Sequence, residues 1–309
     1  MVVPAGMPAP HLKKVQMTGG KKQNLKAYLF IAPTLLILLL VYLYPLLLNL
    51  NYSLRDLSIA GRPFTGMRNY LLMLKDPIFL TSIRNNFILI FALVPILVLV
   101  SLLFAVPLFE RIRGWKFYRG TILLPYITSI TAVGLFFSLF FQGRGILNTF
   151  LKLVHLDSLA ADWLGSTRFA LPAIMFVIVW REFGFGTMLF LARLTTVSEE
   201  LFDAAKIDGT NWLQRIIHVV IPQLATVIEF YVFLMIVTML SWVFNYVYVM
   251  TLGGPARSSY VTELYIYMEA FKFNRMGVAA AVSIALFLIT AVLAFVSFRF
   301  RKRLYREYE

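Results

Sequence analysis

Residues 85–109 read NNFILIFALVPILVLVSLLFAVPLF, and these 25 residues include no Asp, Glu, Lys or Arg. The hydrocarbon core of a bilayer is about 30 Å thick, and a helix crosses it with about 20 consecutive apolar residues. A backbone buried in lipid must also satisfy its own N–H and C=O groups, which an α-helix does within one segment. This segment therefore predicts a membrane-spanning helix, and it makes the chain a membrane protein.

Five further segments on either side of this one have the same apolar character. Three of them have no charged residue, one has Arg181 and Glu182, and one has only Glu229. The charge-free segments are 28–50, 120–143 and 276–298, and the other two are 169–192 and 219–250. The sequence thus predicts an all-α polytopic membrane protein with six transmembrane helices.

The overall composition excludes an ordinary soluble domain. Hydrophobic residues make up 60% of the chain and charged residues 14%, whereas soluble domains have about 45–50% and about 25%. The chain has no cysteine, so neither a disulfide nor a thiolate metal site can form. The three histidines (His11, His155 and His218) lie far apart without a carboxylate cluster, and we expect no metal site.

The basic residues indicate how the chain lies in the membrane. With the N-terminus inside the cell, 17 Lys and Arg fall on the cytoplasmic side, 11 fall outside, and Arg181 lies in the membrane. Cytoplasmic loops usually have the larger share of Lys and Arg, so both termini are expected in the cytoplasm. The expected organisation is a cytoplasmic tail at 1–26, a six-helix domain at 27–300 and a second cytoplasmic tail at 301–309.

One predicted cytoplasmic loop, between the fourth and fifth spans, has a specific pattern. Residues 198–212 read SEELFDAAKIDGTNW. Ser198 can cap a helix whose first turn holds Glu199 and Glu200, near the positive end of the helix dipole. Gly209 can end this helix, because glycine readily adopts the left-handed conformation found there. The loop therefore predicts a short surface helix with an apolar face just outside the membrane.

The same loop resembles the EAA loop of ABC-importer permeases, whose pattern is E-A-A-x3-G-x9-I-x-L-P. Here Asp203-Ala204-Ala205, Gly209, Val219, Ile221 and Pro222 stand at the matching positions. The departures are conservative: Asp for Glu, Val for Ile and Ile for Leu. Further resemblances lie at residues 194–205, 179–181, 145–148, 85–86 and 248–255. They cover about residues 85–298 and are typical of the carbohydrate branch, of the maltose and glycerol-phosphate type.

This resemblance implies a type I ABC importer permease fold and a coupling loop at 195–222. In that family the EAA helix docks on a cytoplasmic ATPase. The residues implied in this coupling are Glu200, Leu201, Asp203, Ala204, Ala205, Asp208 and Gly209. The chain has no G-x-x-x-x-G-K-[ST] motif. We therefore expect a transport subunit that is not an enzyme and binds no cofactor itself, with ATP and Mg²⁺ on partner subunits.

The implied partners are a second homologous permease subunit, two cytoplasmic ATPase subunits and an extracytoplasmic solute-binding protein, in a bacterial or archaeal cytoplasmic (inner) membrane. Nucleic acid is not expected, despite the net charge of +14, because no aromatic and basic platform accompanies it. An amphipathic helix lying on lipid is the alternative for the loop. Its acidic residues weaken that alternative, since an anionic inner leaflet would repel them.

The expected solute is a sugar or oligosaccharide, and its path should be lined by aromatic and amide groups. The candidate residues are Trp242, Asn245, Tyr246, Tyr248, Ser283 and Arg181. Trp242 and Tyr248 could instead pack against partner helices, and Ser283 could bond the carbonyl four residues back. Arg181 could attract an anionic, uronate-type sugar. Since Arg181 and Glu182 should point about 100° apart on a helix, we expect them not to face the same partner.

An ion-coupled secondary carrier that works without ATPase partners is the competing function. Carriers of that class usually have inverted repeats, broken helices and relays of carboxylates at the midplane. The sequence shows none of these features, and we therefore favour the ATP-driven importer.

Overall fold

The structure, a computed structural model, describes residues 21–307, and over that range it is helical with no strand. The chain divides into two compact units, residues 1–48 and 49–309. Helix α1 (Lys21–Ile37) continues through the π-helical turn η1 (Leu38–Leu43) into α2 (Tyr44–Ser53), in which the first unit ends. The segment Tyr28–Ser53 is long and apolar enough to cross a membrane, which confirms the first predicted span.

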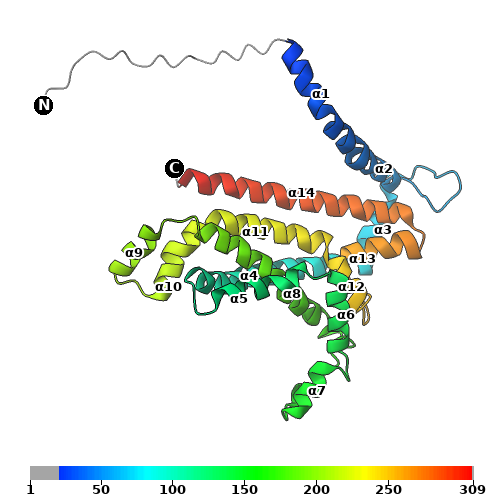
Figure 1. Cartoon of the computed structure of the whole chain (residues 1–309). Coiled ribbons are helices and arrows are strands. Elements are labelled where there is room, and N and C mark those ends of the chain that lie inside the picture. The colour runs from blue at the N-terminus through cyan, green and yellow to red at the C-terminus, as the bar shows by residue number, and fades with distance from the viewer. Residues whose placement is uncertain (1–20, 308–309) are drawn as a thin grey trace, which may run out of the picture. The chain divides into compact units, whose positions relative to one another are not determined.

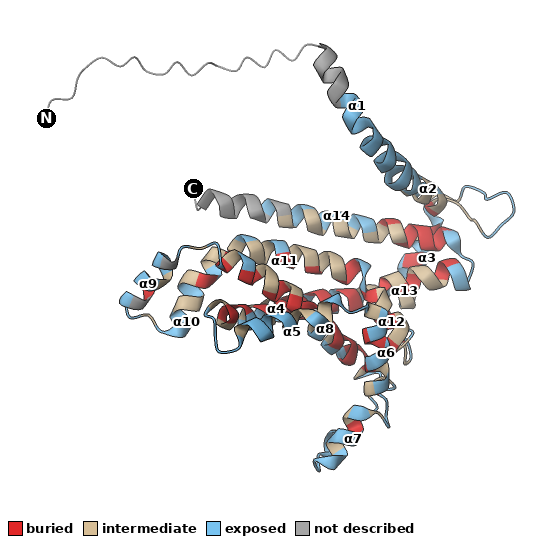
Figure 2. Ribbon diagram, viewed as in Figure 1, coloured by how far each residue is buried: buried red, intermediate tan, exposed pale blue. Residues whose placement is uncertain are grey.

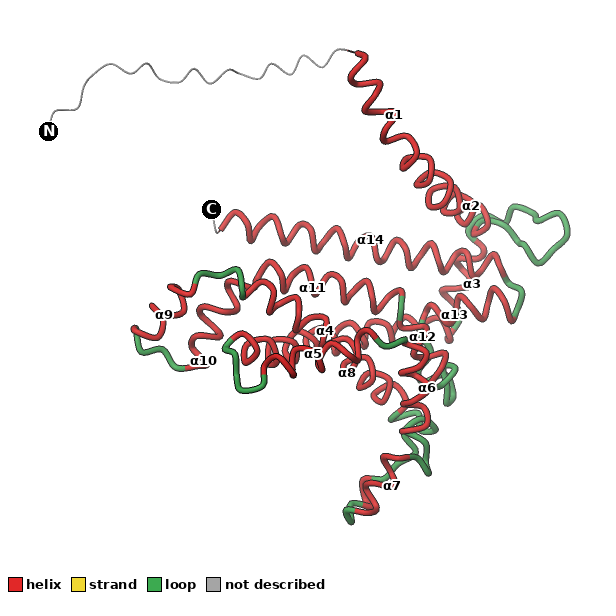
Figure 3. The backbone as a smooth tube through the Cα atoms, viewed as in Figure 1, coloured by secondary structure: helices red, strands yellow, loops and turns green. Residues whose placement is uncertain are grey.

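The second unit is built around four long helices. They are α4 (Pro77–Phe109), α8 (Ala170–Leu194), α11 (Ile221–Ser241) and α14 (Met276–Glu307). The shorter helices are α3 (Arg68–Lys75), α5 (Trp115–Ile127), α6 (Ile130–Phe140), α7 (Ile146–Leu153), α9 (Glu199–Ile207), α10 (Trp212–Arg215), α12 (Val243–Met250) and α13 (Thr262–Tyr267). Single turns η2 (Asp157–Leu159), η3 (Ile216–Val220) and η4 (Met268–Lys272) complete it. Figure 1 shows the order of these elements, and Figure 3 shows the loops that join them.

The core of this unit lies where α4 packs along α8, with α11 against both. Leu97 of α4, Ile178 of α8 and Met239 of α11 are fully buried there. Buried residues lie along α4 and α8 and at the start of α14 (Figure 2), while large apolar side chains such as Phe91 and Leu99 of α4 remain exposed. This distribution is the one expected of helices whose outer faces meet lipid or partner subunits instead of water.

Two of the predicted spans are broken. The segment expected as one helix at 120–143 consists of α5 and α6, which are bent by 93°. Thr128 and Ser129 between them have extended backbone, and the Thr128 hydroxyl donates to the carbonyl of Leu124 at 2.8 Å. Pro125 also lacks a backbone donor, which weakens the helix just before the bend. The segment expected at 219–250 likewise ends at Ser241, and α12 begins after Trp242.

The other predicted spans are confirmed as Pro77–Phe109, Ala170–Leu194 and Met276–Ser297. With Tyr28–Ser53 and Trp212–Ser241, residues 21–307 have five candidate spans, or six if the bent pair counts as one. Helix α1 begins at Lys21, within the tail expected at 1–26, and α14 ends at Glu307, within the tail expected at 301–309. The remainder of the expected tails, 1–20 and 308–309, lies outside the described residues.

Candidate functional site

The short cytoplasmic helix predicted from the loop sequence is α9. It begins at Glu199, directly after Ser198, and it is followed by Gly209 in the left-handed conformation, with φ of +73°. The amides of Asp208 and Thr210 close the end by donating to Ala204 and Ala205 carbonyls at 2.9 and 3.2 Å. A Cβ on Gly209 would meet nothing within 4 Å, so glycine is required there for its backbone and not for space. The predicted helix and its stop are confirmed.

The candidate coupling residues fall on two faces of α9. On one face Phe202 packs against Phe109 at the end of α4, with ring centroids 4.9 Å apart, and Ala205 is buried. The face pointing away from the protein includes the exposed residues Glu200, Leu201, Ala204 and Asp208. Thus α9 is fixed to the membrane helices through one face and leaves the opposite face open.

A pocket of about 490 Å³, which we name the coupling pocket, separates α9 and α10 from the end of α4. Asp203 and Phe202 line it from α9, and Trp212 lines it from α10. Across it, Arg215 forms an ion pair with Glu110 at 3.5 Å. A capping box between Asn211 and Gln214 stabilises the N-terminus of α10. The loop is therefore a folded unit attached to the end of α4.

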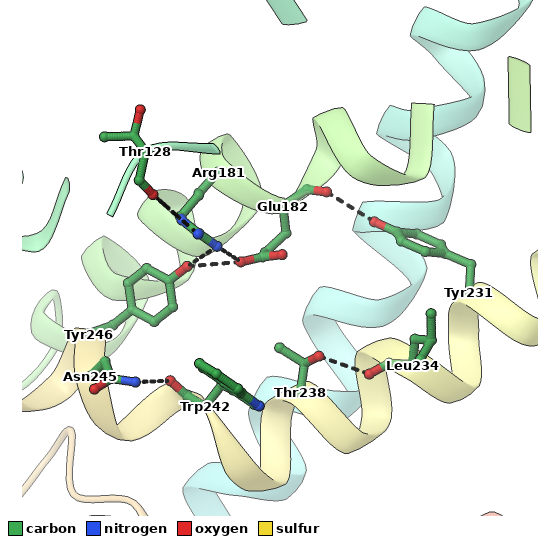
Figure 4. A network of polar contacts seen from close by, with 9 residues as sticks. All are labelled: Thr128, Arg181, Glu182, Tyr231, Leu234, Thr238, Trp242, Asn245 and Tyr246. Carbon is green, nitrogen blue, oxygen red and sulfur yellow. Dashed lines mark hydrogen bonds and ion pairs between the residues drawn. The ribbon is translucent and has the colours of Figure 1, made fainter. Parts of the chain in front are cut away.

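A second polar site surrounds Arg181 in the middle of α8 (Figure 4). Its Nε and Nη2 atoms each donate to the Thr128 carbonyl at 3.2 Å, and Nη1 donates to Glu182 Oε1. The Tyr246 hydroxyl donates to the same Glu182 oxygen at 3.0 Å. The guanidinium carbon also lies 5.3 Å from the centroid of the Tyr126 ring. We call Thr128, Tyr126, Arg181, Glu182 and Tyr246 the arginine network.

The expectation that Arg181 and Glu182 cannot face the same partner is wrong. Their Cβ atoms leave the helix in different directions, but the long arginine side chain turns back to its neighbour. Both side chains then reach Tyr246, whose hydroxyl lies 3.5 Å from Arg181 Nη1. Because Glu182 is buried, its charge needs this pairing, and the pair leaves the site nearly neutral.

The network lies where the two broken spans meet. Thr128 is at the bend between α5 and α6, and Tyr246 is in α12 just after the break at Trp242. The helices α6 and α12 pack against each other, with Gly134 facing Val249 so closely that an added Cβ would lie 3.1 Å from Val249 Cγ1. Gly184 similarly lets α8 approach the backbone of α5 at Ile122.

The structure brings only part of the predicted solute path together. Trp242 is 56% exposed, and Asn245 donates to its carbonyl at 3.5 Å. Tyr246 is 1% exposed and its hydroxyl is engaged in the arginine network. Tyr248 instead stacks on Phe244, and Ser283 donates to the Ala279 carbonyl at 2.9 Å. These contacts favour packing for Tyr248 and a hydrogen bond within its own helix for Ser283.

Sequence reasoning missed Thr128, Tyr126 and Tyr231. Tyr231 of α11 is buried, and its hydroxyl donates to the Glu182 carbonyl at 3.3 Å. The only signal for Thr128 was the order Pro125, Thr128, Ser129, which weakens a helix but does not identify a partner. A charged pair at Arg181 and Glu182 in lipid did indicate that hidden partners must exist.

At the end of α4 opposite the coupling pocket, Asn85 and Asn86 hold the loop between α12 and α13. Asn85 donates to the carbonyls of Ser258 and Tyr260 at 2.9 and 2.8 Å. Asn86 donates to Glu263 Oε2 at 3.2 Å, and burial raises the pKa of Glu263 to about 7. Oε1 of Glu263 is shielded and has no hydrogen-bond partner within residues 21–307. No group of three or more His, Asp or Glu that could hold a metal occurs in the described part of the chain.

Comparisons with known proteins agree with this architecture. Residues 77–308 match the family described as "Binding-protein-dependent transport system inner membrane component". The chain is 32% identical over 282 residues to a probable ABC transporter permease protein of Bacillus subtilis, covering 89% of this chain and 95% of that protein. It is 31% identical over 279 residues to the lactose transport system permease protein of Rhizobium radiobacter, covering 89% and 93%.

The fold is similar to that of a solved bacterial alginate ABC transporter in complex with an alginate pentasaccharide-bound periplasmic protein. The TM-score is 0.79 at 21% sequence identity, and the match covers 92% of this chain and 96% of that chain.

Proposed function

The chain belongs to the family of binding-protein-dependent transport system inner membrane components, and from this membership we propose that it is one permease subunit of an ATP-driven importer for a sugar or oligosaccharide. It is a multi-pass helical protein of the inner membrane with a type I importer fold, and its relatives are permease subunits and not enzymes. We further propose its energy source, its partners and its solute contacts.

The open face of α9 is the observation that carries the coupling proposal. The exposed residues Leu201, Ala204 and Asp208 form a small surface that an ATPase subunit could cover, while Phe202 holds α9 on the end of α4. A displacement of α9 would therefore be transmitted to α4 and, through η3, to α11. Because the sequence has no P-loop motif, ATP and Mg²⁺ belong to the partner in this proposal.

The proposed assembly has a second permease subunit, two ATPase subunits and an extracytoplasmic solute-binding protein. The alginate transporter of similar fold was solved with a periplasmic protein, which supports a binding-protein partner here. The exposed apolar side chains on the outer faces of the helices support a further membrane partner as well as lipid. In this proposal the α9 end and both termini lie in the cytoplasm, an orientation that the excess of basic residues on that side supports.

We propose that the solute meets Trp242, which is exposed, and its half-buried neighbour Asn245. An aromatic face suits the apolar face of a sugar ring, and an amide suits its hydroxyl groups. The anionic, uronate-type alternative is less favoured, because Arg181 donates to Thr128 and Glu182 and its charge is already paired. A neutral sugar is the solute class that this arrangement supports best.

The competing function is an ion-coupled carrier without ATPase partners. The expectation that the chain has no broken helices is wrong, since α5 and α6 are sharply bent and α11 ends at Ser241, so it no longer argues against a carrier. Membership of the binding-protein-dependent family favours the ATP-driven importer over the ion-coupled carrier.

Crosslinking from α9 tests the proposal. The chain has no native cysteine, so Ala204→Cys gives a single site on the open face of α9, and Ala60→Cys gives a matched site in the loop between α2 and α3. In native membranes, a thiol-reactive photocrosslinker at residue 204 should capture a chain that contains a P-loop, and the residue 60 control should not. Capture of lipid alone from residue 204 would contradict the coupling role.

A further inference from the structure

A second pocket, of about 320 Å³, lies at the same end of the helices as α9 and shares only Phe109 and Arg111 with the coupling pocket. We name it the basic pocket. Arg111, Trp115 and Arg119 line it from the segment that joins α4 to α5 and from α5 itself. Leu191 and Thr195 line it from the end of α8. It is therefore a cleft between the ends of three membrane helices.

The basic pocket is rich in unpaired positive charge. Neither Arg111 nor Arg119 forms an ion pair with any acidic residue within the described part of the chain. The neighbouring carboxylate, Glu110, is paired with Arg215. Arg113 and Lys116 lie on the same short segment, and Lys116 Nζ is 5.8 Å from the centroid of the Trp115 ring.

The backbone at the pocket adds to this positive potential. The helix α5 has 13 residues and starts directly after Gly114, whose φ is +83°. Its N-terminus places the positive end of the helix dipole beside Trp115. Two guanidinium groups and a helix N-terminus together suit a ligand with a negatively charged oxygen group, such as a phosphate.

Large apolar side chains are exposed along α5. No residue of α5 is buried, and Phe117 is 73% exposed and Ile127 67% exposed. Half-buried Trp115 lines the pocket beside the two arginines, and aromatic side chains commonly mark the membrane interface. A ligand that uses both parts has an anionic head and long hydrocarbon chains.

We propose that the basic pocket binds the phosphate group of an anionic phospholipid of the cytoplasmic leaflet, with its acyl chains along α5. Basic pockets between membrane helices on the cytoplasmic side bind such headgroups. The inference is independent of the solute and of the contact between α9 and an ATPase. It requires only that this end of the helices lies at a membrane surface.

Native mass spectrometry of the purified importer in detergent tests it, with phosphatidylglycerol or phosphatidylethanolamine added. The double variant Arg111→Gln/Arg119→Gln removes the two pocket charges, and Arg144→Gln/Arg168→Gln is the matched control in the segment between α6 and α8. Each arginine near the surface should change lipid affinity about fivefold, so the double variant should bind phosphatidylglycerol about 30-fold more weakly. The control should bind it as the wild type does.

Equal binding of phosphatidylglycerol by the pocket variant and the wild type would overturn the proposal, as would equal binding of the two lipids by the wild type. Displacement of the lipid by millimolar inorganic phosphate would show a free-anion site and would also contradict it. A second measurement does not depend on the folding of the charge variants. Brominated phosphatidylglycerol should quench Trp115 fluorescence in the wild type, and Trp115→Phe should remove that component of the quenching. If Trp115→Phe were quenched as strongly as the wild type, the lipid would bind elsewhere and the proposal would be wrong.

Discussion

Arg181 donates two hydrogen bonds, both of 3.2 Å, to the main-chain oxygen of Thr128, which is the residue where α5 ends before the 93° bend. The carbonyl at the end of a helix has no partner within its own helix, and in a membrane it cannot rely on water. Arg181 supplies that partner, and through Tyr246 it also reaches the second broken span. One side chain thus stabilises both breaks, and its charge is balanced by Glu182.

Removal of this arginine alone should destabilise the protein. In Arg181→Gln the Glu182 carboxylate stays buried without its ion pair, a change that typically costs about 3–5 kcal/mol. The double variant Arg181→Gln/Glu182→Gln removes both charges, and it should recover much of the lost stability. Thermal unfolding of the purified importer measures both variants.

Arg84→Gln is the matched control, because Arg84 is exposed and forms no ion pair with a described residue. A double variant as unstable as the single one would contradict the internal ion-pair role. If the double variant regained stability but lost uptake of a uronate while keeping uptake of neutral sugars, Arg181 would instead be a contact for an anionic solute.

The turn after α9 should be needed for coupling. Gly209→Val places a β-branched residue at a φ of +73°, which strains the backbone by about 1–2 kcal/mol and should disorder the end of α9. We expect ATP hydrolysis by the assembled importer to continue while solute uptake falls strongly. Gly209→Asn is the matched control, since asparagine tolerates this conformation and a Cβ meets no atom there. Normal uptake by Gly209→Val would be incompatible with the coupling role of the turn.

Trp242 should contribute to solute affinity. Its ring is largely exposed beside Asn245. Trp242→Ala should therefore raise the solute concentration for half-maximal uptake about tenfold, equivalent to about 1.4 kcal/mol of lost contact. Tyr248→Phe should have no such effect, because Tyr248 packs on Phe244 and Tyr267. The measurement is the solute concentration for half-maximal uptake. Equal values for Trp242→Ala and the wild type would remove Trp242 from the path.

Stability should fall as the pH rises through the range in which Glu263 ionises. Burial raises the pKa of this carboxyl from 4.5 to about 7 in the folded protein, so the fold favours the protonated form. The stabilisation is complete below about pH 4.5 and is lost as the pH approaches about 7, by up to about 3 kcal/mol. The check is the difference in thermal midpoint between the wild type and Glu263→Gln across this range.

In Glu263→Gln the group cannot ionise, and the wild type should lose stability relative to this variant as the pH rises. Glu110→Gln serves as the control, because its exposed carboxylate pairs with Arg215 at the opposite end of α4. A constant difference between Glu263→Gln and the wild type at every pH would show that Glu263 does not titrate in this range.

Local signals in the sequence were sufficient for α9 and for the unbroken spans. Helix α9 lies between two local signals, Ser198 before its first residue and Gly209 after its last, and the charge-free run at 85–109 needs only the bilayer to make it a helix. The bend at Thr128 was not predictable in the same way. Pro125 is often tolerated in a membrane helix, and the group that stabilises the bend, Arg181, is 53 positions away in sequence.

The candidate solute path shows the same limit. Trp242, Asn245 and Tyr246 share a helical face by spacing, but the helix breaks at Trp242. Tyr246 consequently enters the buried arginine network while Trp242 remains exposed. Sequence spacing indicates which residues are neighbours, whereas tertiary contacts determine which of them remain available to a ligand.

Solute uptake by the reconstituted importer tests whether transport by this subunit is driven by ATP and depends on a binding protein. The permease pair, the ATPase subunits and the binding protein are placed in liposomes, and uptake of a neutral sugar is measured with ATP at the ATPase side or with an ion gradient alone. We expect uptake to require ATP and the binding protein, and to fall strongly in Gly209→Val while hydrolysis persists. Uptake driven by an ion gradient in the absence of ATP would contradict it.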